Sequence, residues 1–187
     1  GRQAQDRVAA LSHRRALAAQ AAGVFDAEIV PIEVPQRKGG PLWVDADEGI
    51  RPGTTIETLG RLPGAFAEGG TLTAGNSSQI SDGASAVVLT TRSHADENGW
   101  PVLAVVGAAG QVAGPDTSLH AQPARAIEAA LQRAGMDAAA LDFIEINEAF
   151  GAVVAYSAAE LGISEDGGSL HGGGIAIGHA FGASGNR

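Results

Sequence analysis

Apolar and polar positions in the first third of the chain predict one helix, one strand and a long loop. Residues 3–22 have helical spacing, with Gly23 as a C-terminal stop and four apolar side chains along one side: Val8, Leu11, Ala18 and Ala22. Residues 28–34 alternate as a strand does, and Pro31 favours a position at a sheet edge. Residues 35–53 are rich in proline, glycine and charge, which predicts an irregular loop.

The rest of the chain alternates between predicted strands and helices. The continuous apolar runs at residues 85–91 and 101–107 are typical of strands that are buried on both faces, and residues 143–146 predict a shorter strand. Helical segments are predicted from Thr54 or Thr55 to about Leu62 and at residues 92–98. A third helix is predicted from Pro123 to Ala134, with Ile127 and Leu131 inward. A fourth, from Glu148 to Leu161, is predicted to be buried because it is apolar almost all round. This alternation indicates an α/β fold with a central hydrophobic sheet.

Composition narrows the possible functions. Hydrophobic residues make up 44% of the 187 positions and glycine occurs 27 times, which suits a tightly packed α/β protein. The net charge of −9 argues against general nucleic-acid binding, but allows one anionic ligand held by a few arginines and helix N-termini. There is no long apolar run and no signal peptide, so we expect no membrane contact and a cytoplasmic location.

The absence of cysteine removes disulfides and thiolate metal sites, and His13, His94 and His171 have no metal-ligand spacing. We therefore expect neither a metal nor a cofactor. The chain starts at Gly1, inside a helical pattern, and stops at Arg187 just after a Gly-Ala-Ser-Gly run. We expect it to be an internal segment of a longer protein.

The segment Gly172–Gly185 contains the strongest candidate for chemistry, His179. Glycines weaken a strand but let the backbone come close to a substrate, and an imidazole can activate a nucleophile and then stabilise an oxyanion. A hydrogen-bonded histidine in a glycine turn is the alternative.

Two other segments have candidate polar groups. Asn147-Glu-Ala-Phe150 stands between a predicted strand and a predicted helix, where Asn147 could simply be a helix N-cap. Thr71-Leu-Thr-Ala-Gly-Asn-Ser-Ser78, followed by Asp82-Gly-Ala-Ser-Ala, could be a polar turn before a strand.

Together these three segments resemble the thiolases, the coenzyme-A-dependent enzymes that make or cleave 3-ketoacyl thioesters. Thiolases have Gly-Gly-x-Ile-Ala-x-Gly-His-Pro followed by Gly-Ala-Ser-Gly, with Ala180 here in place of the proline. Asp47-Glu-Gly-Ile-Arg51 also resembles a thiolase segment. The resemblance implies the thiolase fold, an α/β fold of two βαβαβαββ halves in αβαβα layers. Residues 1–80 would be the rear of the CoA-binding loop domain, 81–98 the end of the first half, and 99–187 most of the second half.

The resemblance also implies roles for individual residues. His179 would activate a nucleophilic cysteine and help to form an oxyanion hole, and Asn147 would hold a catalytic water. CoA-binding positions would be Arg51 beside the nucleotide and Phe150 in the pantetheine channel. The small residues Ala74, Gly75 and Ser78 would let the pantetheine pass close to the backbone. Thr58 and Phe66, which lie outside the strong motifs, would also contact CoA.

Thiolases use two cysteines, and this chain has none. Two hypotheses follow. In the first, the chain is part of an acyltransferase that acts on acetyl-CoA or 3-ketoacyl-CoA, forms a homo-oligomer (dimer or tetramer), and carries both cysteines outside these residues. In the second, it is a cysteine-free remnant that binds CoA or a partner without catalysis.

Overall fold

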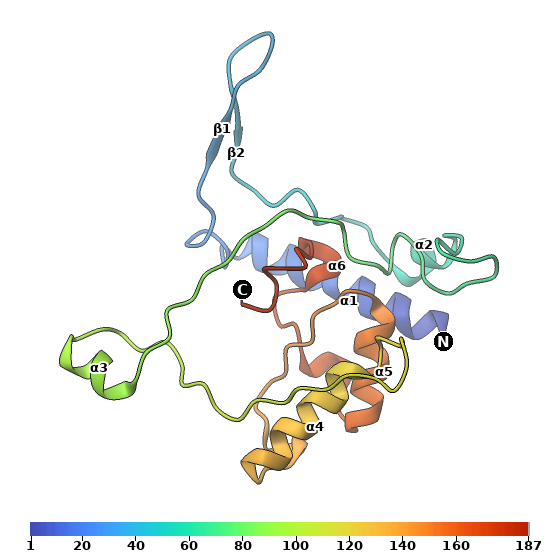
Figure 1. Ribbon diagram of the computed structural model, residues 1–187. Helices are drawn as coiled ribbons and strands as arrows, with labels where there is room; N and C mark the ends of the chain where they lie inside the picture. Colours follow the sequence, from blue (N-terminus) through green and yellow to red (C-terminus); the bar gives the residue numbers. More distant parts are fainter. Residues whose placement is uncertain (187) are drawn as a thin grey trace.

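The computed structural model describes residues 1–186, and most of its helices gather around one long N-terminal helix (Figure 1). This helix, α1, spans Arg2–Ala21, and three others pack against it: α2 (Ile56–Gly60), α5 (Gly151–Leu161) and α6 (Gly174–Ile177). The remaining helical segments are α3 (Arg92–Glu97), α4 (Gln122–Ala134), which packs on α5, and the 3₁₀ turns η1 (Ala138–Ala140) and η2 (Glu165–Gly167). Among the described residues, no helix combines the length and apolar character that a membrane crossing requires.

The buried face of α1 differs from the predicted one. Val8 is buried as expected, but Leu11 is half-buried, and Ala18 and Ala22 are exposed. Apolar and polar side chains share the buried face: Gln5, Asp6, Val8, Ala9, Ser12, His13, Ala16 and Ala19. Apolar spacing alone could not find this face, because its polar members are buried through hydrogen bonds to loops far away in the sequence.

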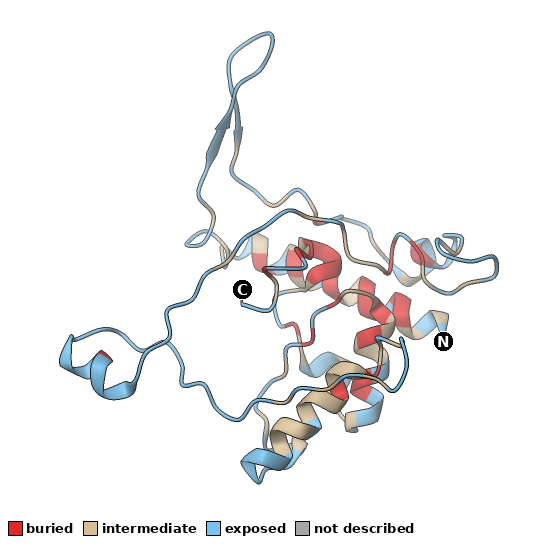
Figure 2. Cartoon of the chain, in the orientation of Figure 1, coloured by how far each residue is buried: buried red, intermediate tan, exposed pale blue. Residues whose placement is uncertain are grey.

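Two apolar clusters connect α1 to the segments that surround the candidate site. Val8 and Ala9 pack with Leu59 of α2 and Ile175 of α6. On the next turns of α1, Ala16 packs with Ile50 and Ala176. Figure 2 shows that the buried residues concentrate in this central region, whereas the outer loops are exposed. The core therefore lies next to the loop that carries His179.

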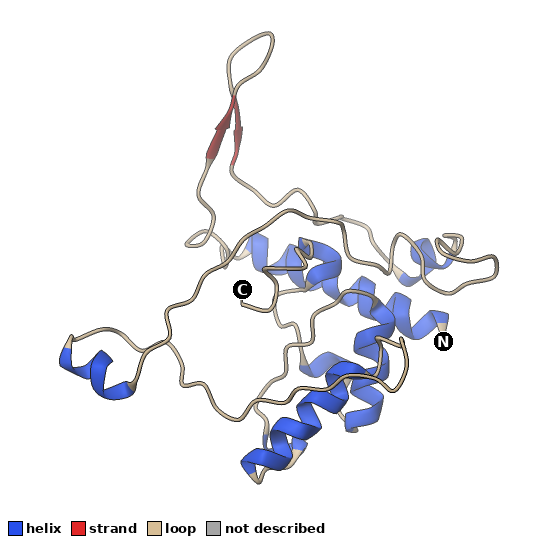
Figure 3. Cartoon of the chain, in the orientation of Figure 1, coloured by secondary structure: helices blue, strands red, loops and turns tan. Residues whose placement is uncertain are grey.

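The only ladder among the described residues is a hairpin that projects from the helices (Figure 3). Its strands, β1 (Ile32–Val34) and β2 (Leu42–Val44), are antiparallel, with Glu33 opposite Trp43. The edge-strand prediction is confirmed for 32–34, and the prediction of an irregular loop is wrong at β2. An alternating Leu-Trp-Val triplet within a glycine-rich segment is too short to stand out as a strand.

The three other strand predictions are wrong for this chain. Residues 85–91 and 101–107 form the long exposed loops on either side of α3, and Val88 and Leu103 are 89% and 98% exposed. Of residues 143–146, only Ile144 forms a bridge, to Gly168. A strand needs a partner for its backbone groups, and no described residue forms a β-bridge with either apolar run.

The helix predictions match better, because helices are held by local hydrogen bonds. Thr55 caps α2, and α3 lies within 92–98. Helix α4 has Pro123 in its first turn and ends at Ala134, with Gly135 as its C-cap. The exception is α5, which begins at Gly151 rather than Glu148 and is only partly buried. Residues 147–150 have a different structure because they contact another segment of the chain.

Candidate active site

The three candidate segments meet through their backbones. The Ser78 N–H donates a 3.0 Å hydrogen bond to the Ala149 carbonyl. Two residues further along, Ile80 forms a parallel bridge with His179. Residues 71–80 therefore lie between the other two segments and contact both.

Buried Asn76 holds the first segment in shape. Its side-chain oxygen accepts from the Thr73 N–H at 2.8 Å, and its amide nitrogen donates to Asp6 Oδ1 at 2.9 Å and to the Thr71 carbonyl at 3.1 Å. Thr73 and Asn76 are fully buried, and Asp6 also pairs with Arg2. The segment is a polar turn, but one that α1 fixes in a single position.

The glycines before His179 permit a close approach to α1. Gly172 has φ = +85°, and a Cβ there would lie 2.7 Å from both the Ala16 Cβ and the Ser12 carbonyl oxygen. A Cβ on Gly173 would overlap the Glu148 carboxylate. These contacts require glycine and place the loop against the core.

His179 is 9% exposed and contacts two polar side chains. Its Nδ1 lies 2.8 Å from Ser184 Oγ, and the Asn147 amide nitrogen lies 3.1 Å from Nε2 and 3.3 Å from Nδ1. The nearly equal distances place this amide between the two ring nitrogens, off the lone-pair direction of either. Nε2 therefore keeps the capacity to exchange a proton with a further group.

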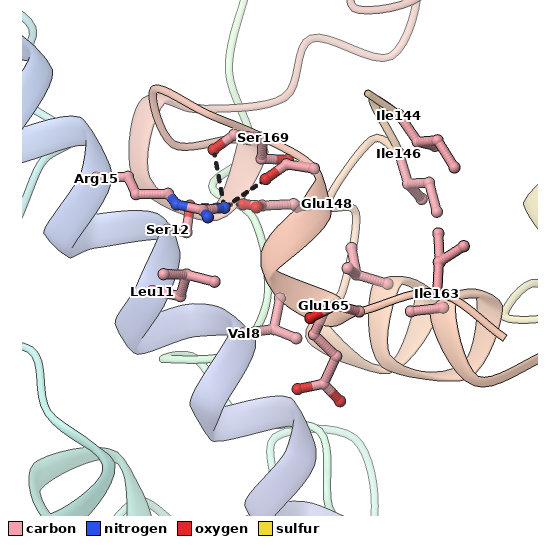
Figure 4. Close-up of a pocket in the computed structure, with 14 residues that line it drawn as sticks. Val8, Leu11, Ser12, Arg15, Ile144, Ile146, Glu148, Ile163, Glu165 and Ser169 are labelled. Carbon is pink, nitrogen blue, oxygen red and sulfur yellow. Dashed lines mark hydrogen bonds between the residues drawn. The ribbon is translucent and has the colours of Figure 1, made fainter. Parts of the chain in front are cut away.

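Glu148, the neighbour of Asn147, is 2% exposed. Figure 4 shows its carboxylate directed toward Ser12 of α1. Its carboxylate accepts from Ser12 Oγ at 2.6 Å and from the Ile175 N–H at 3.2 Å. Burial raises the pKa of Glu148 above its usual value, and these two hydrogen bonds act in the opposite direction. On the same side, Arg15 donates to the Gly168 and Asp166 carbonyls.

Phe66 and Phe150, two predicted CoA-binding residues, come together across the chain. Their rings form a T-shaped pair with centroids 5.8 Å apart, and Phe66 is 68% exposed. Gly75 lies against Leu59 and Leu62, whose side-chain ends would have to move to admit a Cβ there. These residues make an apolar corner beside Ser78 and Ala74, which stay predictions as CoA contacts.

Arg51 lies on the exposed surface, and its backbone is anchored to α1. The Arg51 N–H donates to Nδ1 of buried His13 at 3.1 Å. Burial, and secondarily the Arg51 charge, lower the pKa of His13 below 6.5. Thr58 is also exposed, and its hydroxyl completes the capping box of α2 with Thr55. Neither Arg51 nor Thr58 contacts His179, and the CoA role of each stays a prediction.

A cavity of about 530 Å³ opens beside residues 172–184, the histidine loop that carries His179. Its wall includes Asn147, Gly174, Gly178 and Ser184, together with the exposed His171. A site of this size can admit the reacting end of an organic substrate.

Comparison with known families identifies this arrangement. Residues 1–93 match the family model "Thiolase, N-terminal domain", and residues 100–187 match "Thiolase, C-terminal domain". The chain belongs to the thiolase family.

Individual thiolases show the same relationship. A probable acetyl-CoA acetyltransferase of Mycolicibacterium smegmatis is 52% identical over 98% of this chain and 47% of its own length. The peroxisomal 3-ketoacyl-CoA thiolase B of Rattus norvegicus is 46% identical over all of this chain and 45% of its own length. The chain thus spans about half the length of the curated relatives it matches.

A solved thiolase structure confirms the fold. The crystal structure of the Bacillus anthracis acetyl-CoA acetyltransferase superposes with a TM-score of 0.88, at 36% identity, covering 99% of this chain and 47% of that one. The predicted thiolase fold is therefore correct, although the described residues form no layered sheet. The proposed internal boundaries at residues 80 and 98 stay predictions.

Within this thiolase structure, the N-cap interpretation of Asn147 is wrong. Phe150 is the residue that precedes α5, and Asn147 points to His179 instead. Sequence reasoning did not find the contacts of Ser184, Ser12 and Glu148. Ser184 and Glu148 stood within recognised motifs, but no sequence signal connects Ser12 with either.

Proposed function

We propose that the full-length protein is a thiolase-type acyl-CoA C-acyltransferase. It would act on acetyl-CoA and 3-ketoacyl-CoA by Claisen condensation or thiolysis. The observation that carries this proposal is the contact between His179 and Asn147 in a member of the thiolase family. Relatives named acetyl-CoA acetyltransferase and 3-ketoacyl-CoA thiolase support it.

In the proposed reaction, Nε2 of His179 takes the proton of a cysteine thiol supplied by a segment outside this chain. For condensation, the thiolate attacks the thioester carbonyl of acetyl-CoA, the C–S bond breaks, and CoA leaves with a proton from a second cysteine outside the chain. For thiolysis, the thiolate attacks the 3-keto carbonyl of 3-ketoacyl-CoA, the C2–C3 bond breaks, and the acetyl-CoA carbanion leaves with a proton from that second cysteine. In both cases the acyl group stays on the first cysteine. The second cysteine, now a thiolate, then removes a proton from another acetyl-CoA for condensation, or from CoA for thiolysis. The resulting nucleophile takes the acyl group and frees the first cysteine.

We propose that neutral His179 carries its proton on Nδ1. Ser184 Oγ donates its proton to the Ala180 carbonyl at 3.1 Å, so its oxygen is left to accept a hydrogen bond from Nδ1–H at 2.8 Å. Once protonated, Nε2–H can donate to the oxyanion that forms on the substrate, together with a water held by Asn147.

The proposed CoA path uses the other predicted residues. Phe66 and Phe150 form an apolar wall for the pantetheine arm, beside Ala74, Gly75 and Ser78. Arg51 and Thr58 lie on the exposed surface further out, where a cation suits the nucleotide phosphates. The CoA thioester is the substrate, and the proposed reaction needs no metal or cofactor. A cytoplasmic dimer or tetramer is part of the proposal.

The test is CoA-dependent cleavage of acetoacetyl-CoA by the full-length protein. His179→Ala should lower the rate by at least roughly two to three orders of magnitude, the scale for losing a base or an oxyanion donor. Asn147→Ala should lower it less, because a water can partly re-form. His94→Ala, in exposed α3, is the control and should keep full activity.

Near-wild-type turnover by His179→Ala would overturn the assignment. A natural subunit of only 18.7 kDa that binds CoA without turnover would instead support the non-catalytic alternative. A subunit mass about twice as large, with turnover, supports the acyltransferase.

A further inference from the structure

We infer that Glu148 and Ser12 are positioning residues that hold the loop 172–175, and through it His179, in register with Asn147. This inference rests on the proposed function. It gives a role to the buried carboxylate of the Asn147–Phe150 segment, which the proposed chemistry does not use.

The hydrogen bonds of this pair leave the loop little freedom. Ser12 Oγ donates to Glu148 Oε2 at 2.6 Å and accepts from the Gly173 N–H at 3.0 Å. The same carboxylate oxygen accepts from the Ile175 N–H at 3.2 Å. Ser12 is 1% exposed and Glu148 is 2% exposed, so water cannot replace these partners without a local opening.

The fixed loop is connected to His179 by one short turn. Ile175 belongs to α6, which ends at Ile177, and the Gly178 N–H donates to the Gly174 carbonyl at 3.0 Å. His179 follows directly. A displacement at residues 173–175 therefore moves the imidazole, because α6 is too short to absorb it.

Asn147 and Glu148 contact opposite ends of the segment 174–179. Asn147 reaches the imidazole, and Glu148 reaches the first turn of α6. Because the two residues are adjacent in the chain, the Glu148 contact sets where the loop lies relative to Asn147. Ser12 adds the third support from α1, where Gly172 packs directly on Ala16.

Glu148 acts through the loop and not on the substrate. Its hydrogen-bond partners are Ser12 and Ile175, neither of which is a reacting group. A misplaced catalytic group can cost on the order of a hundredfold in rate without weakening substrate binding. Removal of this support should therefore lower kcat more than it raises KM.

The first test compares Ser12→Ala with Ser157→Ala in the full-length protein. Ser157 is an equally buried helical serine that donates to the His120 carbonyl, away from the histidine loop. Ser12→Ala should lower kcat for acetoacetyl-CoA cleavage roughly ten- to a hundredfold, with KM changed less than about twofold. Ser157→Ala should keep kcat near the wild-type value.

The second test uses rescue by a conservative variant. In Glu148→Gln the amide oxygen can take the place of Oε2 and still accept from both Ser12 Oγ and the Ile175 N–H, so most of kcat should return. Glu148→Ala loses both contacts and should match Ser12→Ala. Hydrogen exchange gives a readout that does not need activity: the amides of Gly173 and Ile175 should exchange faster in Ser12→Ala than in Ser157→Ala.

The outcomes separate this inference from the proposed function. Suppose that the wild type is active and His179→Ala is inactive, but Ser12→Ala and Ser157→Ala have equal kcat and equal amide hydrogen exchange. The proposed function then stands, but the positioning inference is wrong. If Glu148→Gln is as impaired as Glu148→Ala, charge and not positioning matters, which also overturns it. An inactive wild type contradicts the proposed function, and unequal exchange would still show that Ser12 holds the loop.

Discussion

The imidazole of His179 has different neighbours at each nitrogen, and this asymmetry decides what it can do. Ser184 Oγ lies at hydrogen-bond distance from Nδ1, whereas the Asn147 amide lies between the two nitrogens. Only Nε2 is thus left to exchange a proton with substrate or nucleophile. The ring is also tilted against Phe181, with centroids 4.9 Å apart.

Ser184→Ala should disturb this asymmetry without removing the base. Nδ1–H loses its acceptor, so the proportion of the tautomer protonated on Nε2 should rise and kcat should fall by roughly tenfold. Nitrogen-15 NMR of the His179 ring measures the tautomer directly. Ser184→Thr, which keeps the hydroxyl, is the control. An unchanged tautomer ratio in Ser184→Ala would contradict the proposed role of Ser184.

Arg51 is predicted to act by charge alone. Arg51→Ala should raise KM for acyl-CoA while kcat stays nearly constant, because the contact exists equally in the ground state and the transition state. The increase in KM should shrink as salt is added, since salt screens an exposed ion contact. Arg92→Ala, which removes an arginine of exposed α3, should leave KM unchanged. A loss confined to kcat would rule out this role.

Helix α1 contacts the site through polar side chains. Asp6 binds Asn76, Ser12 binds Glu148 and Gly173, and His13 binds the backbone of Arg51. The same helix supplies Val8 and Ala16 to the two apolar clusters. One helix therefore supports all four segments of the predicted site.

The buried His13 on α1 should make stability depend on pH. Its folded-state pKa is lowered from 6.5, because burial disfavours the imidazolium and Arg51 adds repulsion. The stability that neutral His13 contributes is fully present above about pH 6.5. It is lost as pH falls from there through the folded-state pKa, by up to about 1.4 kcal/mol per pH unit.

His13→Asn isolates this effect, since Asn Oδ1 can accept from the Arg51 N–H but does not titrate. We expect the free energy of unfolding of the full-length wild type to fall relative to the variant as pH drops below 6.5. Denaturant titrations at several pH values measure the difference. The opposing titration of Glu148, whose pKa is raised, cancels because both proteins contain it. Parallel stability curves would show that His13 is not held neutral.

Over the whole molecule, apolar surface is concentrated in the segments on either side of α3. Val88, Leu89, Leu103 and Val106 are between 74% and 98% exposed, in stretches whose sequence is typical of buried strands. Long exposed apolar stretches with free backbone groups favour association with other chains.

Residues 1–187 expressed alone should therefore aggregate and have no thiolase activity. The chain contains no thiol, and Ser184 cannot replace one, because a hydroxyl is a weak nucleophile and a serine ester is less reactive than a thioester. Size-exclusion chromatography and acetoacetyl-CoA cleavage check both statements. A monomer that unfolds cooperatively and turns over substrate would contradict them.

The sequence by itself determined the thiolase family, most helices and the identity of the candidate catalytic pair. Helices such as α2 and α4 depend on local hydrogen bonds and caps, and the motifs around Asn147 and His179 are contiguous, so both can be read along the chain. Only the tertiary structure decided which apolar runs became strands, because a strand depends on a distant partner. It also decided that Asn147 faces His179 instead of capping α5, and that Ser12 supports Glu148, because hydrogen bonds between residues 32 and 136 positions apart leave no periodic pattern in the sequence.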